Sequence, residues 1–390
     1  MSLSSQKSPK FSSEIWKTLT KWIHSKKEYK PEYLSEPEPR AAIEETCRIL
    51  STPLKNISVK QEIPAELTAA LENNIFFFSG FKTHHELVQV SQLLKDGNGN
   101  IKPFQQFLKD VEKIDDTYNR NYLNAEYNFA TASSQMAVKW KEWEEDGDRY
   151  DLQYRTAGDD RVRDEHAALN NTTLPPSDPF WQLYLPPNGW NCRCTTVQVR
   201  KGKHPRSDSE KAVAKGNATT NTPKKQIFRF NPGAQEKIFP PKHPYYKAGE
   251  AVQKTLKKIL EKSAVAAERE KYLEEMQPLL NKRVVMKTDD GTITIGFTKK
   301  GNKHLHSDTF GRVKGFDKEE LKNIDKALKK SVFEKSAEIS KERKDEIKKF
   351  YYFKDKDEKL YYNVAERVYE NNGIEHKQRF LYSITNSIKK

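Results

Sequence analysis

Cysteine is scarce in this sequence, which holds only Cys47, Cys192 and Cys194 among its 390 residues. An odd number of cysteines, two of them nearly adjacent, argues against a disulfide scaffold and suits a reducing cytoplasm. Long apolar runs are also missing: the run IFFF at residues 75–78 has four residues, far below the ~18 that a membrane span needs. The first residues, MSLSSQKSPKFSS, lack the apolar core of a signal peptide. We therefore expect neither a membrane span nor export by the ordinary secretory route.

Hydrophobic residues are few, at 35% of the chain against 32% charged residues, and the mean hydropathy is -0.92. Several segments should therefore be exposed or extended, although the length allows two or three domains of ~100–200 residues each. Positive charge is in excess, with a net charge of +14. This charge favours a polyanionic neighbour, either nucleic acid or an acidic protein surface, and charge alone does not distinguish them.

The N-terminal segment, residues 1–64, combines an apolar stripe at helical spacing with a proline-rich linker. The stripe consists of Ile15, Trp16, Leu19, Trp22 and Ile23. It predicts a helix that docks either on the protein's own body or in a groove of a neighbouring subunit. Three prolines and three glutamates at residues 31–39 predict a linker that interrupts any helix, before a second helix at residues 40–50.

The chain is predicted to be mainly helical from residue 64 to residue 143. Helices are expected at residues 66–73 and 84–95 and from residue 104 onward, with a turn at residues 97–100. We interpret the aromatic stripes here as core, and His84 and His85 as surface or capping residues. Two strands, at residues 150–154 and 195–199, should frame the stretch between them and bring residues 155–160 close to Cys192 and Cys194.

That framed stretch, residues 155–194, is unusually dense in reactive and rigid residues, and two interpretations compete. In the first, Asp160, His166, Cys192 and Cys194 converge on a metal, because thiolate and imidazole are the ligands that zinc prefers. The spacing Cys-x-Cys is closer than in most zinc sites. In the second, the residues are structural: the aspartates pair with Arg161, Arg163 or Arg193, Trp181 and Trp190 cap a small core, and the prolines hold an extended loop.

The same stretch resembles the phage Mu protein F-like family of minor head (head morphogenesis) proteins. The resemblance rests on DRVR at residues 160–163, on His166 and Leu169, and on PPNGWNCRC at residues 186–194. The segments NIFFFSGFK at 74–82 and YNRNYL at 118–123 are similar to that family too. The family motif thus comprises Asp160, Arg161, Arg163, His166, Trp190, Cys192, Arg193 and Cys194. The resemblance covers about residues 65–205 and implies a virion protein, without enzymatic activity in this domain, that contacts the phage portal and capsid proteins.

Residues 201–280 change character. A polar stretch up to about residue 222 is typical of a loop or tether. Aromatic residues among prolines follow at residues 228–246, which we interpret as an ordered strap on a surface. A helix is expected at residues 249–276, leading into the last domain.

The last domain, residues 281–390, is predicted to be α+β with an antiparallel sheet. A helix is expected at residues 318–329 and a turn at 371–373. Strands are expected at residues 283–286, 292–297, 350–353, 360–369 and 378–388. This domain has 27 Lys and Arg residues against 18 Asp and Glu residues, so 9 of the 14 excess positive charges lie here. An anionic substrate or partner is therefore favoured in this domain.

The last strand suggests a phosphate site. If Phe380 and Ile384 face the core, Arg379, Ser383 and Thr385 share the opposite face. Arg367 would join them from the preceding strand. Guanidinium groups pair with phosphate and hydroxyls donate to its oxygens. His304 and His306 could supply the acid and base of a metal-free ribonuclease, although exposed strand faces are normally polar and two histidines beside Lys303 could equally cap a helix.

In order and residue type this domain resembles the phage members of the barnase-EndoU-colicin-RelE nuclease group. The resemblance implies His304 as acid or base, Arg367 and Arg379 as phosphate clamps, and Thr385 as transition-state donor. His306 and Ser383 are reserves. Glu366 is a base only if its strand is shifted in register.

The sequence therefore predicts a multidomain α+β protein: an N-terminal helical and linker segment (1–64), a small α/β head-morphogenesis domain (65–200), a tether, strap and helix (201–280) and a nuclease-like domain (281–390). The first hypothesis is a phage or prophage minor head protein in the virion, assembled in the bacterial cytoplasm, whose last domain is a metal-independent ribonuclease-like toxin with RNA as substrate and an immunity protein as partner. The second is a purely structural virion protein whose basic last domain binds nucleic acid or capsid. The third is a metal nuclease at His166, Cys192 and Cys194, which is disfavoured because such enzymes usually need carboxylates. Only the metal interpretation requires a cofactor, zinc.

Overall fold

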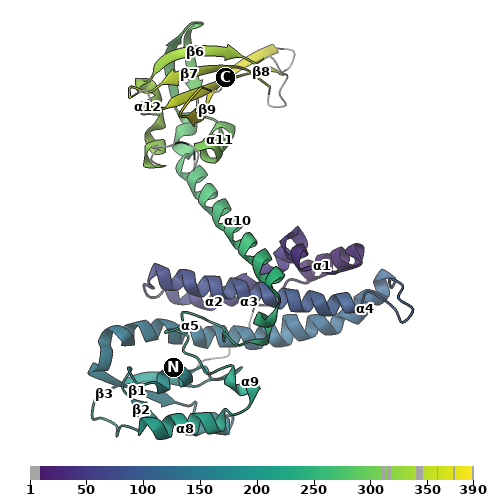
Figure 1. Ribbon diagram of the computed structural model, residues 1–390, viewed down its shortest axis with the longest axis vertical. Helices are drawn as coiled ribbons and strands as arrows, with labels where there is room; N and C mark the ends of the chain where they lie inside the picture. The colour runs from purple at the N-terminus through teal and green to yellow at the C-terminus, as the bar shows by residue number, and fades with distance from the viewer. Residues whose placement is uncertain are drawn as a thin grey trace. The chain divides into compact units, whose positions relative to one another are not determined.

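The computed structural model describes residues 9–309, 313, 318–339, 346–357, 359–371 and 374–388. The chain forms two compact units, residues 1–259 and 260–390. Helices dominate the first unit, and the second contains a large sheet with helices (Figure 1). The predicted α+β fold class, with a mainly helical N-terminal half, is confirmed. Within the described residues, no helix is both long and apolar enough to span a membrane.

The N-terminal helix docks on the protein's own body. Four residues of the predicted stripe in α1 (Ser13–Lys26) are buried in the core of the first unit: Trp16, Leu19, Trp22 and Ile23. The predicted linker at residues 31–39 is wrong, because this segment forms a 3-10 helix, η1 (Pro31–Ser35), and then begins helix α2 (Pro37–Ser58). Prolines are tolerated in the first turn of a helix, where the N–H groups have no partner within the helix. They therefore begin these helices instead of breaking them.

A single long helix, α3 (Ala65–Gln92), replaces the two short helices predicted for this segment. The apolar run in its middle lies in the core, where Ile75 and Phe78 are fully buried. Gly80 marks a close approach, since a Cβ atom added there would lie 2.4 Å from Leu256 Cδ2. Burial of this run against several elements keeps the helix continuous.

The rest of the helical body confirms most of the predicted aromatic stripe as core, but Tyr122 is 47% exposed. Helix α4 (Phe104–Asp115) passes through a π-helical segment, η2 (Asp116–Tyr122), into α5 (Leu123–Asp146). Phe107 and Phe129 are buried, and α2 packs against both α3 and α5. His84 and His85 are half-buried rather than surface caps: the Tyr29 hydroxyl lies 2.8 Å from His84 Nδ1, and His85 Nε2 lies 3.1 Å from the Tyr245 carbonyl oxygen.

A small antiparallel sheet follows α5, in the order β2-β1-β3. Its strands are β1 (Tyr150–Arg155), β2 (Thr173–Leu174) and β3 (Thr195–Arg200), so both predicted strands are confirmed. Short helices surround it: η3 (Gly147–Arg149), α6 (Asp164–Ala167), α7 (Phe180–Tyr184), α8 (Ser209–Thr219) and α9 (Pro223–Gln226). The predicted loop or tether is therefore wrong for residues 209–219, which form α8. Helix α8 packs on α7, and a Cβ at Gly216 would lie 2.5 Å from the Tyr184 ring.

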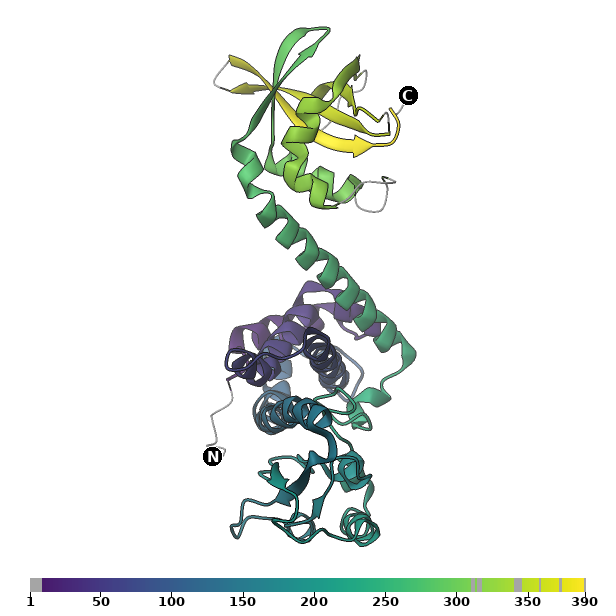
Figure 2. The ribbon, with the colours of Figure 1, turned by 90° about the vertical axis from the view of Figure 1, so that its left-hand side faces the viewer.

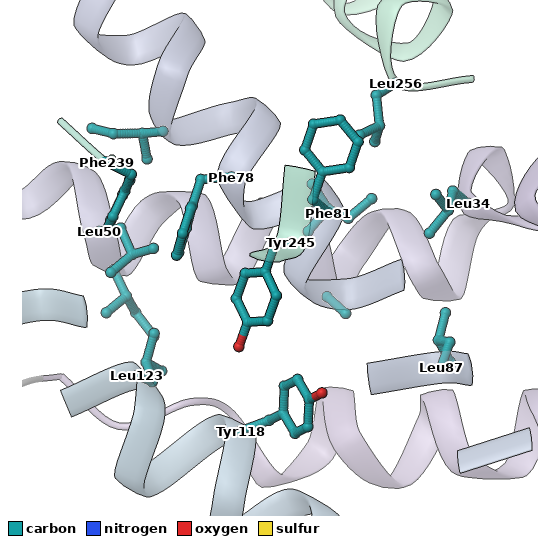
Figure 3. Close-up of a cluster of buried hydrophobic side chains, with 14 of the residues drawn as sticks. Leu34, Leu50, Phe78, Phe81, Leu87, Tyr118, Leu123, Phe239, Tyr245 and Leu256 are labelled. Atoms are coloured by element: carbon teal, nitrogen blue, oxygen red, sulfur yellow. The ribbon is translucent and has the colours of Figure 1, made fainter. Parts of the chain in front are cut away.

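The segment after α9 enters the core instead of lying on a surface, as the predicted strap would. The Phe239 ring stacks on Phe78 of α3 with centroids 3.7 Å apart, and Phe230 and Tyr245 are also buried. Figure 3 shows Phe239, Phe78 and Tyr245 together, with Tyr118 facing them. A 3-10 helix, η4 (Pro244–Lys247), then precedes helix α10 (Glu250–Glu275), which confirms the predicted connecting helix.

The second unit is a six-stranded sheet with helices against one face. Its elements are η5 (Gln277–Asn281), β4 (Arg283–Thr288), β5 (Gly291–Gly296), α11 (Lys299–Thr309), η6 (Lys318–Asn323), α12 (Ile324–Lys330), β6 (Val332–Glu338), β7 (Ile347–Lys354), β8 (Tyr361–Asn371) and β9 (Ile374–Thr385). The strand order is β4-β5-β9-β8-β7-β6. The predicted strands are confirmed, but β6 was not predicted and β5 pairs with β9 in parallel. Figure 2 shows the light green helices beside the yellow strands. The predicted turn at 371–373 lies partly outside the described residues.

Candidate functional site

The small sheet brings the two ends of the motif stretch together. Strands β1 and β3 pair along their whole length, with Arg155 opposite Thr195, so the loop leaving β1 and the loop entering β3 are neighbours. Arg193 closes them with two hydrogen bonds to the Asp159 carboxylate, of 2.5 and 2.6 Å. The predicted proximity of residues 155–160 to the Cys-x-Cys element is therefore confirmed.

Three side chains that can bind a metal converge behind this ion pair. His166 lies on α6, and Cys192 and Cys194 lie just before β3; all three are buried. Their ligand atoms lie within 4.8 Å of one another. His166 Nδ1 is 3.5 Å from the sulfur of Cys192 and 3.5 Å from the sulfur of Cys194.

The imidazole is oriented from its other side. His166 Nε2 lies 3.3 Å from the carbonyl oxygen of Asn188. The Asn188 side chain is fixed in turn, because it accepts a 2.9 Å hydrogen bond from the Tyr154 hydroxyl and donates to the Leu185 carbonyl oxygen at 3.3 Å. Nδ1 therefore points at the two sulfurs.

The electrostatics of the group favour a thiolate. Hydrogen bonding with Cys194, and then with His166, holds the pKa of Cys192 well below its usual range despite burial. The same neighbouring thiolate, together with burial, raises the pKa of Cys194. Arg193 holds the pKa of Asp159 below its ordinary value. The two sulfurs thus differ in acidity, and Arg161, Arg163 and Arg193 line the cavity beside them.

The other motif residues are structural. Asp160 is exposed and does not belong to the His166 group, because the chain turns so that Asp159 faces Arg193 instead. Arg161 also pairs with Asp159. Arg163 donates to the Trp190 carbonyl oxygen at 2.7 Å. Trp190 packs edge-on against Phe129 with centroids 5.0 Å apart, and Trp181 is fully buried. Both tryptophans therefore pack in core, but in two different clusters instead of capping one small core.

The predicted phosphate site of the last domain does not form one face. Strand β9 has an extra residue at Tyr382, because Val364 pairs with Leu381 while Asn363 pairs with Ser383. A bulge resets the alternation of side chains. As a result Arg379 lies on one face of the sheet, with Leu381 and Ile384, while Ser383 and Thr385 lie on the other.

The other residues of the predicted phosphate site have partners of their own. Asn363 donates hydrogen bonds to Ser383 and Thr385, at 3.0 and 3.2 Å. Both arginines face carboxylates: Arg379 Nε is 2.7 Å from Glu366 and Arg367 Nε is 2.6 Å from Glu346. His304 and His306 belong to α11, and their side chains lie outside the described part of the structure. Leu305 of α11 packs in the cluster that contains Leu381 and Ile384, so this helix lies on the face opposite Ser383 and Thr385.

A buried charge cluster in the helical body was missed from the sequence. Lys82 of α3 is fully buried, with Nζ 2.5 Å from the Glu126 carboxylate and 2.7 Å from the Tyr118 carbonyl oxygen. Glu86, one turn further along α3, accepts a 2.8 Å hydrogen bond from Asn119. The signal was available, since a lysine within the apolar run NIFFFSGFK needs a buried partner.

Comparison with known proteins finds similarity within this region of the chain. Residues 89–197 match the sequence model of a family described as "Phage Mu protein F like protein". A "Putative capsid assembly protein F" of Escherichia phage Mu is 35% identical over 104 residues, 26% of this chain and 21% of that protein. A "Mu-like prophage FluMu F protein" of Haemophilus influenzae is 39% identical over 64 residues, 15% of this chain and 16% of that protein. The chain thus spans about a fifth or less of the length of these curated relatives. No solved structure matches.

Proposed function

We propose that this chain is a minor head protein that takes part in capsid assembly of a phage or prophage. The match of residues 89–197 to the Mu F-like family supports this role. That segment contains the whole motif stretch and α5, which packs on the N-terminal helix α2. In this proposal the protein acts beside the portal and capsid proteins and is carried in the virion.

The physical character of the first unit suits a structural role. Two arginines of its motif close loops: Arg193 pairs with Asp159, and Arg163 donates to the Trp190 carbonyl oxygen. Among the described residues, the cavity beside His166 is lined by no carboxylate that could act as a general base. An assembly surface needs such rigidity, whereas hydrolytic chemistry needs a positioned base.

Loss of the protein is expected to abolish infectious particles in the phage or prophage that encodes it. The test deletes the gene and restores it either as the full chain or with a stop codon after Glu275, which keeps all of α10. If assembly depends on the first unit, both should restore DNA-filled heads, and mass spectrometry should find the chain in purified particles. Normal particles without the gene would overturn the proposal.

For the second unit we propose a metal-independent ribonuclease-like effector, with RNA as its substrate and an immunity protein as its partner. The observation that favours it is the hydrogen-bonded group of Asn363, Ser383 and Thr385 on one sheet face, in a domain rich in positive charge. The separation of Arg379 from this group weighs toward the alternative. In that alternative the basic domain binds nucleic acid or capsid without cutting.

Incubation of the full chain with RNA and excess chelator distinguishes the ribonuclease from the binding module that does not cut. A ribonuclease is expected to cut, and both His304→Ala and Thr385→Ala should reduce cleavage strongly. Thr292→Ala, at an exposed position of β5, serves as the matched control and should cut normally. RNA binding without cleavage would identify a docking module, and cleavage unchanged in both variants would contradict the proposed residues.

A further inference from the structure

We propose that His166, Cys192 and Cys194 form a zinc site that fixes α6 to the start of β3. This inference does not rest on the proposed role in capsid assembly. The donor set consists of two sulfurs and one imidazole nitrogen, which are the ligands that zinc prefers over calcium or magnesium. All three side chains are buried, so the site is shielded from competing solvent.

The distances between the donor atoms fit a shared zinc ion. Zinc lies ~2.3 Å from sulfur and ~2.05 Å from nitrogen, and a tetrahedral angle then separates sulfur and nitrogen by about 3.6 Å. In this protein His166 Nδ1 is 3.5 Å from each of the two sulfurs. The two separations are equal, as a common centre requires.

Hydrogen bonding alone explains this arrangement poorly. A neutral imidazole has one proton and one lone pair. If Nε2 donates to the Asn188 carbonyl oxygen at 3.3 Å, Nδ1 has a single lone pair, which accepts from one thiol only. A second hydrogen bond to Nδ1 therefore does not account for the equal distance of the other sulfur. A metal-binding histidine almost always donates its other N–H to such an oxygen. The Tyr154 and Leu185 contacts that hold Asn188 therefore act as the outer support of the site.

The fourth position of the ion is available to water. A cavity of about 20 Å³ borders the three groups and is lined also by Ala157, Val162 and Asn191, and one water needs roughly 10–15 Å³ of such space. Three arginines also line it: Arg161, Arg163 and Arg193. With no carboxylate in that lining to serve as a base, the ion has a structural role. It closes a loop of 26 residues between His166 and Cys192, which restricts the unfolded chain.

The test measures metal in the purified full chain. Protein from zinc-supplemented cells is dialysed against metal-free buffer and analysed by elemental mass spectrometry. We expect about one zinc ion per chain, falling close to background in the Cys192→Ser/Cys194→Ser double variant. Cys47→Ser is the matched control, because Cys47 is half-buried in α2 and outside the group, and it should retain the metal.

Two further measurements do not depend on the folding of any variant. Cobalt added to the metal-free wild-type chain should give the intense visible bands of a tetrahedral ion and a thiolate charge-transfer band. Zinc should also protect two of the three cysteines from a thiol reagent and raise the midpoint of thermal unfolding. Absence of bound zinc and of the cobalt bands in the wild-type chain, or zinc retained by the double variant, would overturn the inference.

Discussion

Replacing Lys82 with methionine is expected to lower the free energy of unfolding of the first unit by about 3–5 kcal/mol. Lys82 Nζ is the cation beside the Glu126 carboxylate, which is itself buried, and it also donates to the Tyr118 carbonyl oxygen. Methionine fills a similar volume but, among the described residues, leaves the carboxylate with a 3.5 Å contact to the Tyr245 hydroxyl alone. The cost arises because a buried charge has lost its counterion, while the shape of the core is nearly kept.

Denaturant unfolding followed by tryptophan fluorescence measures this effect cleanly, because all six tryptophans lie before residue 259. The double variant Lys82→Met/Glu126→Gln should recover part of the lost free energy of unfolding, since it also removes the buried carboxylate that has no counterion. Arg40→Met is the matched control: Arg40 pairs with Glu44 at 2.7 Å on an exposed helix face, where such pairs contribute ~0–1 kcal/mol. A Lys82→Met effect no larger than that of the control would show that Glu126 is neutral in the fold.

Replacing Glu86 with glutamine is expected to stabilise the protein increasingly as the pH rises from about 5 to about 8. Burial raises the pKa of Glu86 from its ordinary value of 4.5 to about 8, although Lys82 and the Asn119 hydrogen bond oppose the shift. Between these values the folded protein keeps a proton that the unfolded chain has released. The free energy of unfolding of the parent therefore falls as the pH rises through this window. Glutamine cannot ionise and keeps an oxygen for Asn119.

The difference in unfolding free energy between Glu86→Gln and the parent should be small near pH 5 and reach up to about 5 kcal/mol above pH 8. Glu66→Gln, at an exposed position of the same helix, should show no such trend. Measuring the unfolding free energy of the parent and both variants at half-unit pH steps distinguishes the Glu86→Gln trend from the Glu66→Gln control. A constant difference between Glu86→Gln and the parent across the range would contradict a protonated Glu86 in the folded protein.

Local patterns accounted for much of the fold. Periodic apolar residues identified α1, α4 and α10, and alternation identified β1, β3 and the strands β4, β5, β7, β8 and β9. The order of elements sufficed to bring residues 155–160 near Cys192 and Cys194, because two antiparallel neighbours must align the loops at their shared end. These features depend on interactions over a few residues, or on one strand pairing, so the sequence expresses them directly.

Features decided by contacts between distant segments were missed or misjudged. The aromatic residues at 228–246 were expected on a surface. Phe239 instead stacks on Phe78, because it packs into the core between helices that are distant in the sequence. The alternation of β9 predicted one polar face, but the extra residue at Tyr382 puts Arg379 and Thr385 on opposite faces. The sequence of one strand does not predict such a bulge, because the bulge depends on pairing with the neighbouring strand.

The sequence by itself determined the helical body, the strand pair and the residue types of the motif, because periodicity and composition act locally. Only the tertiary structure decided how His166 meets Cys192 and Cys194: α6 places the imidazole, Asn188 turns it, and β1 pairing with β3 brings the two sulfurs to the same nitrogen. Residues 26 and 28 positions apart converge only when the intervening loop is fixed by the rest of the fold. Spacing alone therefore left both a metal site and a structural cluster open, and the zinc site that we propose rests on the three-dimensional geometry of these three side chains.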